Sequence, residues 1–420
     1  MYHKANFVLP AYAVGLLFTN VGHVLATGFD LPDQDAFAVS RGMAFVATAD
    51  NPSAIYYNPA GITQMSGQNV RGGIYGLHLG ATYRSPAGGS YENTNPWHAI
   101  PQFFYTYMPE KLPVAFGLGI FSPFGLSMNW PQDTGFRTVA TKGSLTYFTV
   151  NPVVAWQVLP KLSVAAGLTA NYAETDLRQG LVWPTQPTDE FRFKGSAWDL
   201  GYNLGVLWKP WEKISLGATF RSTTTMDLKG RTEFFNTTAY GPVSAFPTQR
   251  VDATTRFPFP LKVISGISYR PTPNWNLEFN ADFTGWSRLR TVEIQQAQAF
   301  PPLLPQAVPL TLNWESSWYY EFGVTRNLAN GWQVSAGYIY NENSVPDAHY
   351  TPLVADLDRH FLSIGTGHKG EHLTIDLAYQ FGYGPTRPVV GSAPSGVGQT
   401  ADGKYEFLSH ALMLSLGWHF

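Results

Sequence analysis

Residues 51–62 read NPSAIYYNPAGI, a run that is apolar and yet fits no regular secondary structure. It contains two Asn-Pro steps, and each proline removes a backbone N–H and pushes the residue before it toward extended geometry. The surrounding segment 27–65 is also apolar, with Phe29, Leu31 and Phe45 among its side chains. An apolar, irregular segment of this length must be packed inside something. We therefore predict that it is a plug and that the rest of the chain encloses it.

Beyond about residue 70 the sequence alternates with a period of two, which is the pattern of β-strands. Residues 373–381 place Leu373, Ile375 and Leu377 on one face, and polar or small side chains on the other. The same alternation recurs at residues 198–208 and in similar stretches up to the C-terminus. About fourteen such segments are present, centred near residues 77, 104, 118, 151, 168, 202, 219, 264, 280, 321, 337, 364, 376 and 413.

The connections between these segments alternate between short turns, such as 159–161, and long loops, such as 227–253 and 288–313. Short turns at one end, long loops at the other and an even number of strands are typical of outer-membrane barrels. A sheet that spans a membrane has to close, because hydrocarbon offers no other partner to its backbone groups. The predicted fold is therefore all-β, a transmembrane antiparallel β-barrel of about 14 strands with an N-terminal plug in the lumen.

Tryptophans beside the short turns and at the C-terminus predict an aromatic girdle at one membrane interface. They are Trp156, Trp208, Trp211, Trp275, Trp332 and Trp418. A soluble all-β protein such as a propeller is the alternative. It would show a repeat of about 40 residues with a recurring motif, and this sequence shows none.

The predicted inward face is small and carries few charges, so we expect the plug to fill the bore. Barrels of eight strands fill with their own side chains, whereas larger ones leave a lumen. The glycines expected to face inward are Gly117, Gly119, Gly201, Gly205, Gly217 and Gly337. The inward charges, expected to pair with one another or with the plug, are Arg221, Lys262, Glu278, Asp282, Glu321 and Asp376. A polar pore would show rings of charge, so an apolar path is predicted.

Two features leave alternatives open. The long loops contain apolar runs such as 299–310, 181–184 and 243–247, which form either a lid by packing on each other or a landing surface for an apolar solute. The strand at 114–121 is followed by Pro123, and proline cannot donate to a sheet ladder. Either the strand ends there, or it continues and leaves a gap in the wall.

Composition excludes several classes of function. The net charge of -2 gives no electrostatic case for nucleic acid, and the absence of cysteine excludes disulfides and thiolate chemistry. No Gly-x-Ser-x-Gly or His-Glu-x-x-His motif is present. His368, Glu371 and His372 lie on a predicted turn, and we do not expect a metal there. No catalytic residue, cofactor or metal site is predicted.

The N-terminus reads as a signal peptide, because an apolar run at 7–18 precedes the small residues of a cleavage site at 24–26. A transmembrane anchor is the alternative, but the run is short and contains Pro10, and later stretches lack the roughly 20 apolar residues of a spanning helix. The expected division is 1–26 signal peptide, 27–67 plug and 68–420 barrel.

Several of these motifs together resemble the FadL/TodX family of outer-membrane transporters for long-chain fatty acids and other hydrophobic compounds. The likeness rests on Gly28-Phe29-x-Leu31, Ser40-Arg41-Gly42 and Asn58-Pro59-Ala60, which are similar to the family's hatch, and on Ser122-Pro123-Phe124-Gly125-Leu126, which is similar to its kinked third strand. The terminal Trp418-His419-Phe420 resembles the C-terminal signal of outer-membrane barrels in general.

The resemblance implies passive uptake of a hydrophobic small molecule across the bacterial outer membrane by a non-enzymatic channel. External loops would capture the substrate, a lumenal pocket near Phe29 and Leu31 would bind it, and hatch movement would release it sideways through the wall. The residues implied are Asn58, Pro59 and Ala60 for the hatch, Pro123, Phe124 and Gly125 for the lateral opening, and Phe420 for membrane insertion. The loop 178–195 looks short for members that take fatty acids, which favours hydrocarbons.

The expected partners are the substrate, outer-membrane lipids and the barrel-assembly machinery, with no nucleic acid, and the protein is expected to be a monomer. The alternative from another class is a barrel enzyme resembling a lipase or esterase, or an adhesin, on the same scaffold.

Overall fold

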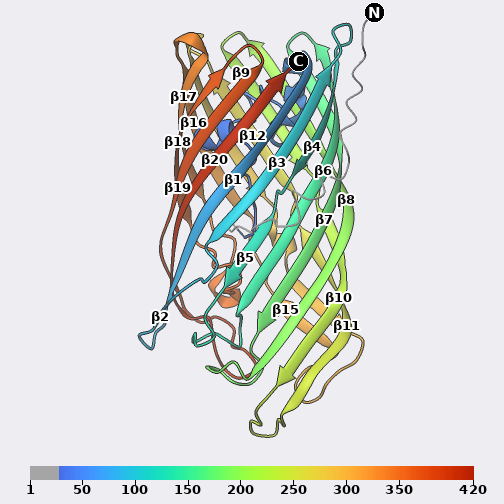
Figure 1. The fold of residues 1–420 in the computed structure, drawn as a ribbon, viewed down its shortest axis with the longest axis vertical. Coiled ribbons are helices and arrows are strands. Elements are labelled where there is room, and N and C mark those ends of the chain that lie inside the picture. Colours follow the sequence, from blue (N-terminus) through green and yellow to red (C-terminus); the bar gives the residue numbers. More distant parts are fainter. Residues whose placement is uncertain (1–27) are drawn as a thin grey trace, which may run out of the picture.

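The structure is a computed structural model that describes residues 28–420. It is a closed antiparallel barrel of 14 strands around an N-terminal plug, so the predicted fold is confirmed (Figure 1). The predicted signal peptide lies outside the described residues. The strands of the wall are β1 (Gly67–Arg84), β3 (Trp97–Met108), β4 (Val114–Phe121), β6 (Lys142–Leu159), β7 (Leu162–Gln179), β8 (Asp189–Trp211), β9 (Ile214–Arg221), β12 (Lys262–Tyr269), β13 (Trp275–Thr284), β16 (Ser317–Asn327), β17 (Trp332–Asn341), β18 (Arg359–Lys369), β19 (Leu373–Val389) and β20 (Gly403–His419).

The first and last strands close the barrel. β1 pairs with β20, with Val70 opposite Trp418, and on its other side with β3, with Val70 opposite Tyr105. Each of the fourteen predicted centres falls in a different one of these strands. The period of two in the sequence therefore correctly predicts every strand of the membrane-spanning wall.

Further strands lengthen the wall at the end that carries the long connections. They are β2 (Ser90–Glu92), β5 (Gly125–Asn129), β10 (Thr224–Asn236), β11 (Phe246–Phe259), β14 (Thr291–Gln296) and β15 (Ala307–Thr311). The prediction that 227–253 and 288–313 are loops is therefore wrong in part, and half of residues 178–195 belong to β7 and β8. Antiparallel pairing continues there because it satisfies backbone groups that water would otherwise have to solvate.

Alternate side chains face outward along each wall strand, as the period of two requires. All six tryptophans of the predicted girdle are among the large apolar side chains that the barrel exposes. They lie beside the short turns or the C-terminus, at the upper end in Figure 1. The predicted girdle is therefore present. None of the helices formed by residues 28–420 is long and apolar enough to cross a membrane.

The plug, residues 28–66, is called the hatch below. It contains α2 (Ala36–Ser40), α3 (Ala54–Tyr57) and η1 (Pro59–Gln64), and Figure 1 shows these elements in dark blue within the barrel. Asp35 starts α2 by accepting hydrogen bonds from the backbone N–H groups of Phe37 and Ala38. Every apolar side chain of these helices is buried, which explains how an irregular, apolar segment is stable here.

Wall glycines make room for the hatch. A Cβ on Gly217 would overlap Val46, one on Gly337 would overlap the backbone of Gly42, and one on Gly205 would lie 2.5 Å from the Asn58 side-chain oxygen. Gly117 and Gly119 both face Ile55 in the same way. Of the six predicted inward glycines, Gly201 alone faces wall side chains instead.

The remaining short helices, all 3-10 turns, lie between wall strands. They are η2 (Trp286–Arg288), η3 (Ala329–Gly331) and η4 (Asp347–His349).

Candidate substrate cavity and gate

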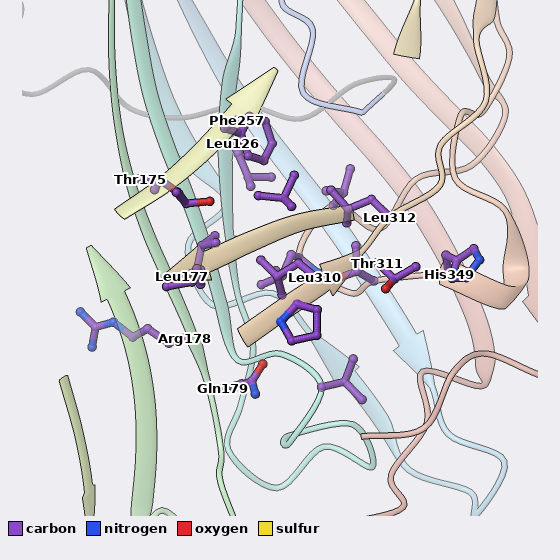
Figure 2. A pocket seen from close by; sticks show the side chains of 18 of the residues that line it. Leu126, Thr175, Leu177, Arg178, Gln179, Phe257, Leu310, Thr311, Leu312 and His349 are labelled. Atoms are coloured by element: carbon purple, nitrogen blue, oxygen red, sulfur yellow. Dashed lines mark hydrogen bonds between the residues drawn. The ribbon is translucent and has the colours of Figure 1, made fainter. Parts of the chain in front are cut away.

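A cavity of 410 Å³ lies inside the barrel, at the hatch face nearest the long connections. Cavities of about 300–1,000 Å³ are the usual size for small-molecule sites. Figure 2 shows Leu310 and Leu312, on and just after β15, reaching into it. Other side chains that line it come from the wall strands and from the connections, among them Leu126, Leu177, Phe191, Leu228, Phe257, Val292, Ile294, Tyr350 and Leu353.

The lining is apolar and uncharged at its surface. Its polar side chains are mainly hydroxyls and amides, with His349 as the only histidine among the lining residues. Arg178 is part of the lining, but its side chain extends away from the other labelled residues (Figure 2), and its guanidinium group pairs with Asp176 on the outer face of the barrel. A ligand in the cavity therefore meets no ionised side chain of the lining.

Phe29, near the start of the hatch, forms part of the cavity floor. Its ring packs 4.6 Å from that of Trp286, 5.5 Å from that of Trp314 and 5.6 Å from that of Phe259, measured between centroids. Edge-to-face contacts at such distances add about 0.5–1.5 kcal/mol each beyond area burial. Gly28 has a φ of +61°, and a Cβ there would lie 2.6 Å from the Trp314 ring, so glycine is required beside this cluster. Leu31 is buried but does not line the cavity.

The wall is interrupted between β4 and β5. The ladder between β3 and β4 runs only to the pair Phe103–Ile120, and β5 pairs with β6 but not with β3. The third strand therefore does not simply end at Ser122, since it resumes at Gly125. Pro123 lies within the interruption, where no ladder requires an N–H from it.

The hatch supplies the hydrogen-bond partners that this interruption lacks. The Gly125 N–H donates to the Phe29 carbonyl over 2.9 Å, and the Leu31 N–H donates to the Pro123 carbonyl over 2.8 Å. Gln34 Nε2 donates to the Ser122 carbonyl over 2.8 Å. Phe124 packs its ring edge-to-face on Phe29, with 6.0 Å between centroids. The start of the hatch thus acts as a short extra strand at the break.

The Asn58-Pro59-Ala60 motif lies at the opposite end of the hatch. Asn58 is fully buried and extended, with φ −158° and ψ 101°. Its side-chain amide donates to the carbonyl of Val46 over 2.8 Å and to that of Val206, in β8, over 2.9 Å. Its side-chain oxygen accepts from the Ala60 N–H over 3.2 Å and so caps η1, which Pro59 begins. Asn58 therefore ties two parts of the hatch to each other and to the wall.

Buried ion pairs fix the hatch to the wall, as expected from the inward charges. Arg71 of β1 pairs with Asp35 of the hatch and, at 2.7 Å, with Asp376 of β19. Lys262 of β12 contacts Asp30 of the hatch over 2.5 Å. All of these side chains are at least nine-tenths buried.

The other predicted inward charges also have partners. Lys262 contacts Asp282 over 2.9 Å, and Arg41 of the hatch reaches Glu278 of β13 over 3.5 Å. Arg221 donates to the Tyr56 carbonyl over 2.7 Å. Glu321 accepts from Asn280 over 2.8 Å. The prediction of pairing with one another or with the plug therefore holds for five of the six residues, whereas Glu321 bonds to an uncharged wall side chain.

Asp33 is a buried acid of the hatch with a perturbed titration. Burial raises the pKa of the Asp33 carboxyl to about 7, hydrogen bonds from Gln380 and Tyr75 oppose the rise, and the nearby Asp30 adds to it. The carboxyl is therefore half-protonated near neutral pH, where an ordinary aspartate is ionised.

Several residues of this site carry no sequence signal. Trp286 and Trp314, which complete the cluster around Phe29, come from irregular connections without periodicity. Two of the apolar loop runs pack on the wall, because Phe300 and Phe246 both contact the ring of Phe234 in β10, at 4.6 and 5.9 Å between centroids, and Leu304 is buried. Their apolar character is the only sequence feature that points to them, and it leaves a lid and a landing surface as alternatives. Residues 28–420 contain no group of three or more His, Cys, Asp or Glu arranged to hold a metal ion.

A closed barrel with an apolar outer surface, an internal plug and an uncharged cavity defines a channel protein of the bacterial outer membrane. The chain matches the model of the outer membrane transport protein family OMPP1/FadL/TodX over residues 18–418 and belongs to that family. Members of this family are transport channels. The prediction of a transporter for hydrophobic compounds is therefore confirmed, and the enzyme alternative is not supported.

Curated relatives match over most of their length. The chain is 21% identical to the long-chain fatty acid transport protein of Escherichia coli K12, covering 83% of this chain and 82% of that protein. It is 22% identical to outer membrane protein P1 of Haemophilus influenzae, covering 86% of each.

Solved structures share the fold. A FadL homologue from Pseudomonas aeruginosa superposes with a TM-score of 0.83 at 19% identity, covering 94% of this chain and 100% of that one. The toluene transporter TodX of Pseudomonas putida gives a TM-score of 0.71 at 15% identity, with 94% and 100% covered.

Proposed function

We propose that the substrate is captured by the external loops, enters the 410 Å³ cavity, displaces the start of the hatch and leaves sideways through the interruption between β4 and β5. One observation carries this proposal. Phe29 lines the cavity with its ring, while its carbonyl accepts the hydrogen bond from Gly125 at the interruption. A ligand that pushes the ring aside must therefore also break the pairing that covers the interruption.

The substrate class follows from the lining. A fatty acid at neutral pH carries a carboxylate, and burying it without a cation costs several kcal/mol, which the neutral hydroxyls and amides of this lining offset only in part. The cavity surface is apolar and offers no ionised side chain, since the Arg178 guanidinium points away. We propose uncharged aromatic or aliphatic hydrocarbons ahead of long-chain fatty acids, although relatives are named for fatty acids or for toluene.

The same proposal assigns a role to each part of the chain. Residues 1–26 are removed on export, 27–67 act as the movable hatch, and 68–420 are the fixed barrel. Asn58, Pro59 and Ala60 hold the far end of the hatch in position, and Pro123, Phe124 and Gly125 form the lateral exit.

Two variants test the route, Asn58→Ala and Gly125→Leu. Losing the amide contacts of Asn58 costs about 1–3 kcal/mol, which shifts the hatch but does not unfold a closed barrel. Leucine at position 125 fills the exit. We expect several-fold slower uptake of a labelled hydrocarbon by cells that carry either variant.

Gly76→Leu is the matched control, because Gly76 is on the lipid-facing side of β1, where a Cβ would approach only the Leu412 carbonyl at 3.6 Å. Capture by the loops, measured as ligand bound to purified protein, should persist in Gly125→Leu. If both variants insert normally and take up hydrocarbon at the parental rate, lateral exit is wrong for this protein.

Assembly is a separate proposal. Phe420 is 67% exposed, and its N–H donates to the Gln68 carbonyl over 3.1 Å, so the ring lies at the end of the barrel beside β1. We propose that the barrel-assembly machinery reads this ring and that the inserted protein is a monomer. Deleting Phe420 should lower the amount of folded barrel in outer-membrane fractions, and unchanged amounts would refute the role.

A further inference from the structure

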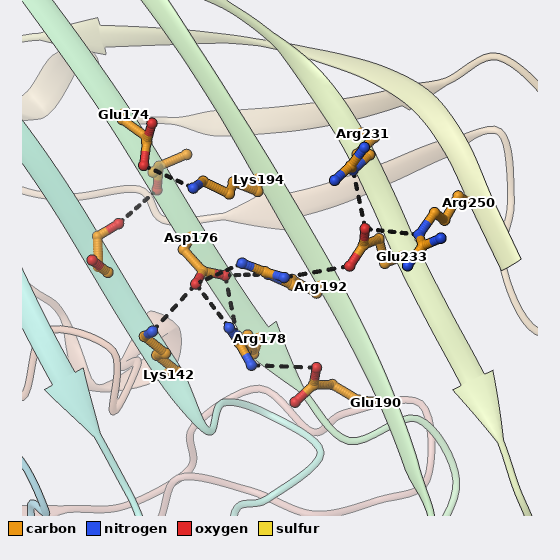
Figure 3. Close-up of polar contacts among 12 residues, drawn as sticks. Lys142, Glu174, Asp176, Arg178, Glu190, Arg192, Lys194, Arg231, Glu233 and Arg250 are labelled. Carbon is orange, nitrogen blue, oxygen red and sulfur yellow. Dashed lines mark hydrogen bonds and ion pairs between the residues drawn. The ribbon is translucent and has the colours of Figure 1, made fainter. Parts of the chain in front are cut away.

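A group of charged side chains lies on the outer surface of the wall formed by β6 to β11, beyond the apolar band (Figure 3). Two carboxylates, Asp176 of β7 and Glu233 of β10, lie at its centre. We call them and the cations that contact them the outer charge cluster; the cations are Lys142, Arg178, Arg192, Arg231 and Arg250. They come from five strands, β6, β7, β8, β10 and β11.

Cations outnumber carboxylates in this cluster. Asp176 contacts Lys142 at 3.2 Å, Arg178 at 3.0 Å and Arg192 at 2.8 Å. Glu233 contacts three arginines at 3.0–3.3 Å, and Arg192 bridges the two carboxylates. Glu190, 3.7 Å from Arg178, adds one further negative charge, and the adjoining Lys194–Glu174 pair is neutral. Asp252 of β11 lies opposite Arg231 in the β10–β11 ladder and adds another negative charge. The five cations of the cluster therefore face four carboxylates, and the surface keeps a positive excess of one.

The two outermost arginines are free to bind an anion. The side chains of Arg231 and Arg250 are 59% and 66% exposed. Within residues 28–420 each contacts Glu233 through its Nε, which leaves the terminal N–H groups of both guanidinium forks available. Guanidinium groups bind phosphate oxygens through two parallel hydrogen bonds, which makes arginine pairs suited to phosphate esters.

The cluster lies at the height of lipid headgroups. The outward apolar face of β7 begins at Leu162 and ends at Tyr172, which packs with Phe148 and Trp198 as an outer aromatic belt. At about 3.3 Å per residue and a tilt of about 45°, this stretch spans roughly 23 Å, close to the apolar band of an outer-membrane barrel. Asp176 follows four residues beyond Tyr172, just above the hydrocarbon.

Below the cluster, the same strands offer a surface for acyl chains. Leu168 of β7 and Leu200 of β8 are 69% and 76% exposed. Across the barrel, the corresponding outward positions of β16 to β18 hold uncharged rings such as Tyr320, Tyr340 and His360. A positive surface above an apolar one therefore occurs on the β6–β11 wall and not on this facing wall.

We propose that the outer charge cluster binds the phosphorylated headgroup of a lipopolysaccharide molecule in the outer leaflet, while the acyl chains lie against Leu168 and Leu200. Asp176 and Glu233 hold the cations in place, and Arg231 and Arg250 reach the phosphate. The bound lipid fastens the projecting β10–β11 hairpin to the membrane surface. This binding is independent of the transport route proposed above.

Native mass spectrometry of the folded protein in detergent, titrated with hexa-acylated lipid A carrying both phosphates, tests the proposal. We expect Arg231→Gln/Arg250→Gln to weaken lipid A binding at least tenfold. The control Arg84→Gln/Lys404→Gln removes two cations that face each other across β1 and β20 and should change binding less than twofold. If the double variant folds poorly, Arg250→Gln alone should weaken binding several-fold.

Two further probes identify the source of the phosphate. Dephosphorylated lipid A should bind the parental protein at least tenfold more weakly, and inorganic phosphate at millimolar concentration should not displace lipid A. Equal binding by the variant and the control, equal binding of the dephosphorylated lipid, or displacement by free phosphate would each overturn the proposal.

Discussion

The two ends of the hatch differ in the balance of the contacts that hold them. The middle and the far end, residues 41–64, are fixed by buried charges and side-chain amides: Glu278 accepts from the Ala47 N–H over 2.8 Å and pairs with Arg41, and Asn58 bonds to β8. The start, residues 28–34, is held by aromatic rings that also line the cavity and by a few hydrogen bonds to the interrupted wall, with Asp30–Lys262 as its one ion pair among the described residues. A hydrophobic ligand competes for the aromatic contacts of the start, and it does not compete for the charged and amide contacts that hold residues 41–64. We therefore expect the ligand to move the start of the hatch and to leave the far end in place.

Glu278→Gln should have the largest effect, because it leaves Arg41 buried without its anion. Breaking a buried pair from one side costs about 3–5 kcal/mol. We expect amide hydrogen exchange of residues 41–50 to speed up strongly, while the wall strands remain protected. Glu406→Gln, which removes the more exposed pair with Arg84, is the control and should cost less than about 1 kcal/mol. Unchanged exchange at 41–50 would mean that this end is not held by charge.

Phe29→Ala should come next. Removing a packed phenylalanine ring costs about 3 kcal/mol or more, and here the loss is confined to the start of the hatch. Exchange should accelerate in a peptide that covers Gly125, whose N–H loses a well-placed acceptor, and should remain unchanged at residues 41–64. Acceleration at both ends would show that the hatch moves as one body and is not released at its start alone.

Gln34→Met preserves the volume of the side chain but removes its donors to Leu31 and Ser122. The expected cost is about 1–2 kcal/mol, and hydrocarbon uptake should rise modestly because the start of the hatch is released more easily. Hydrocarbon uptake by cells that carry equal amounts of each protein is the measurement. Slower uptake would place Gln34 in the binding of the substrate rather than in the latch.

The smallest effect concerns pH. An acid whose pKa is raised from 3.8 to about 7 holds its proton in the folded protein after the unfolded chain has lost it, so protonation favours the seated hatch. This stabilisation is complete below about pH 4 and is lost as the pH rises through about 7. Exchange at residues 28–34 should therefore quicken a few-fold, beyond the intrinsic base catalysis, from pH 6 to pH 8. Asp33→Asn should abolish that excess, and its persistence in the variant would assign it to another group.

The sequence predicts the wall well because a membrane imposes one rule on every strand, an apolar outward face, and residues such as Leu373 and Ile375 follow it. The rule reverses beyond the membrane. In β10 the outward positions hold Asp227, Lys229 and Arg231 while Met226 and Leu228 face inward, so a search for apolar outward stripes reads this strand as a loop.

The cavity is harder to predict than the wall. Phe29 stands in a recognisable motif, but Trp286 and Trp314 reach it from connections that have no period. Their role depends on which loops meet over the hatch, and that is set by tertiary packing rather than by local pattern.

The wall glycines that face the hatch have a consequence for the evolution of this fold. Positions such as Gly217 and Gly337 leave no space for a side chain, because even a methyl group there would overlap the hatch backbone. The hatch and the barrel are therefore not interchangeable modules. A hatch transplanted from another family member would fit only if the backbone segments that approach the wall most closely lay opposite glycines of this barrel. At about 21% identity, chimaeras within the family would need changes in both parts at once, so the two parts must diverge together.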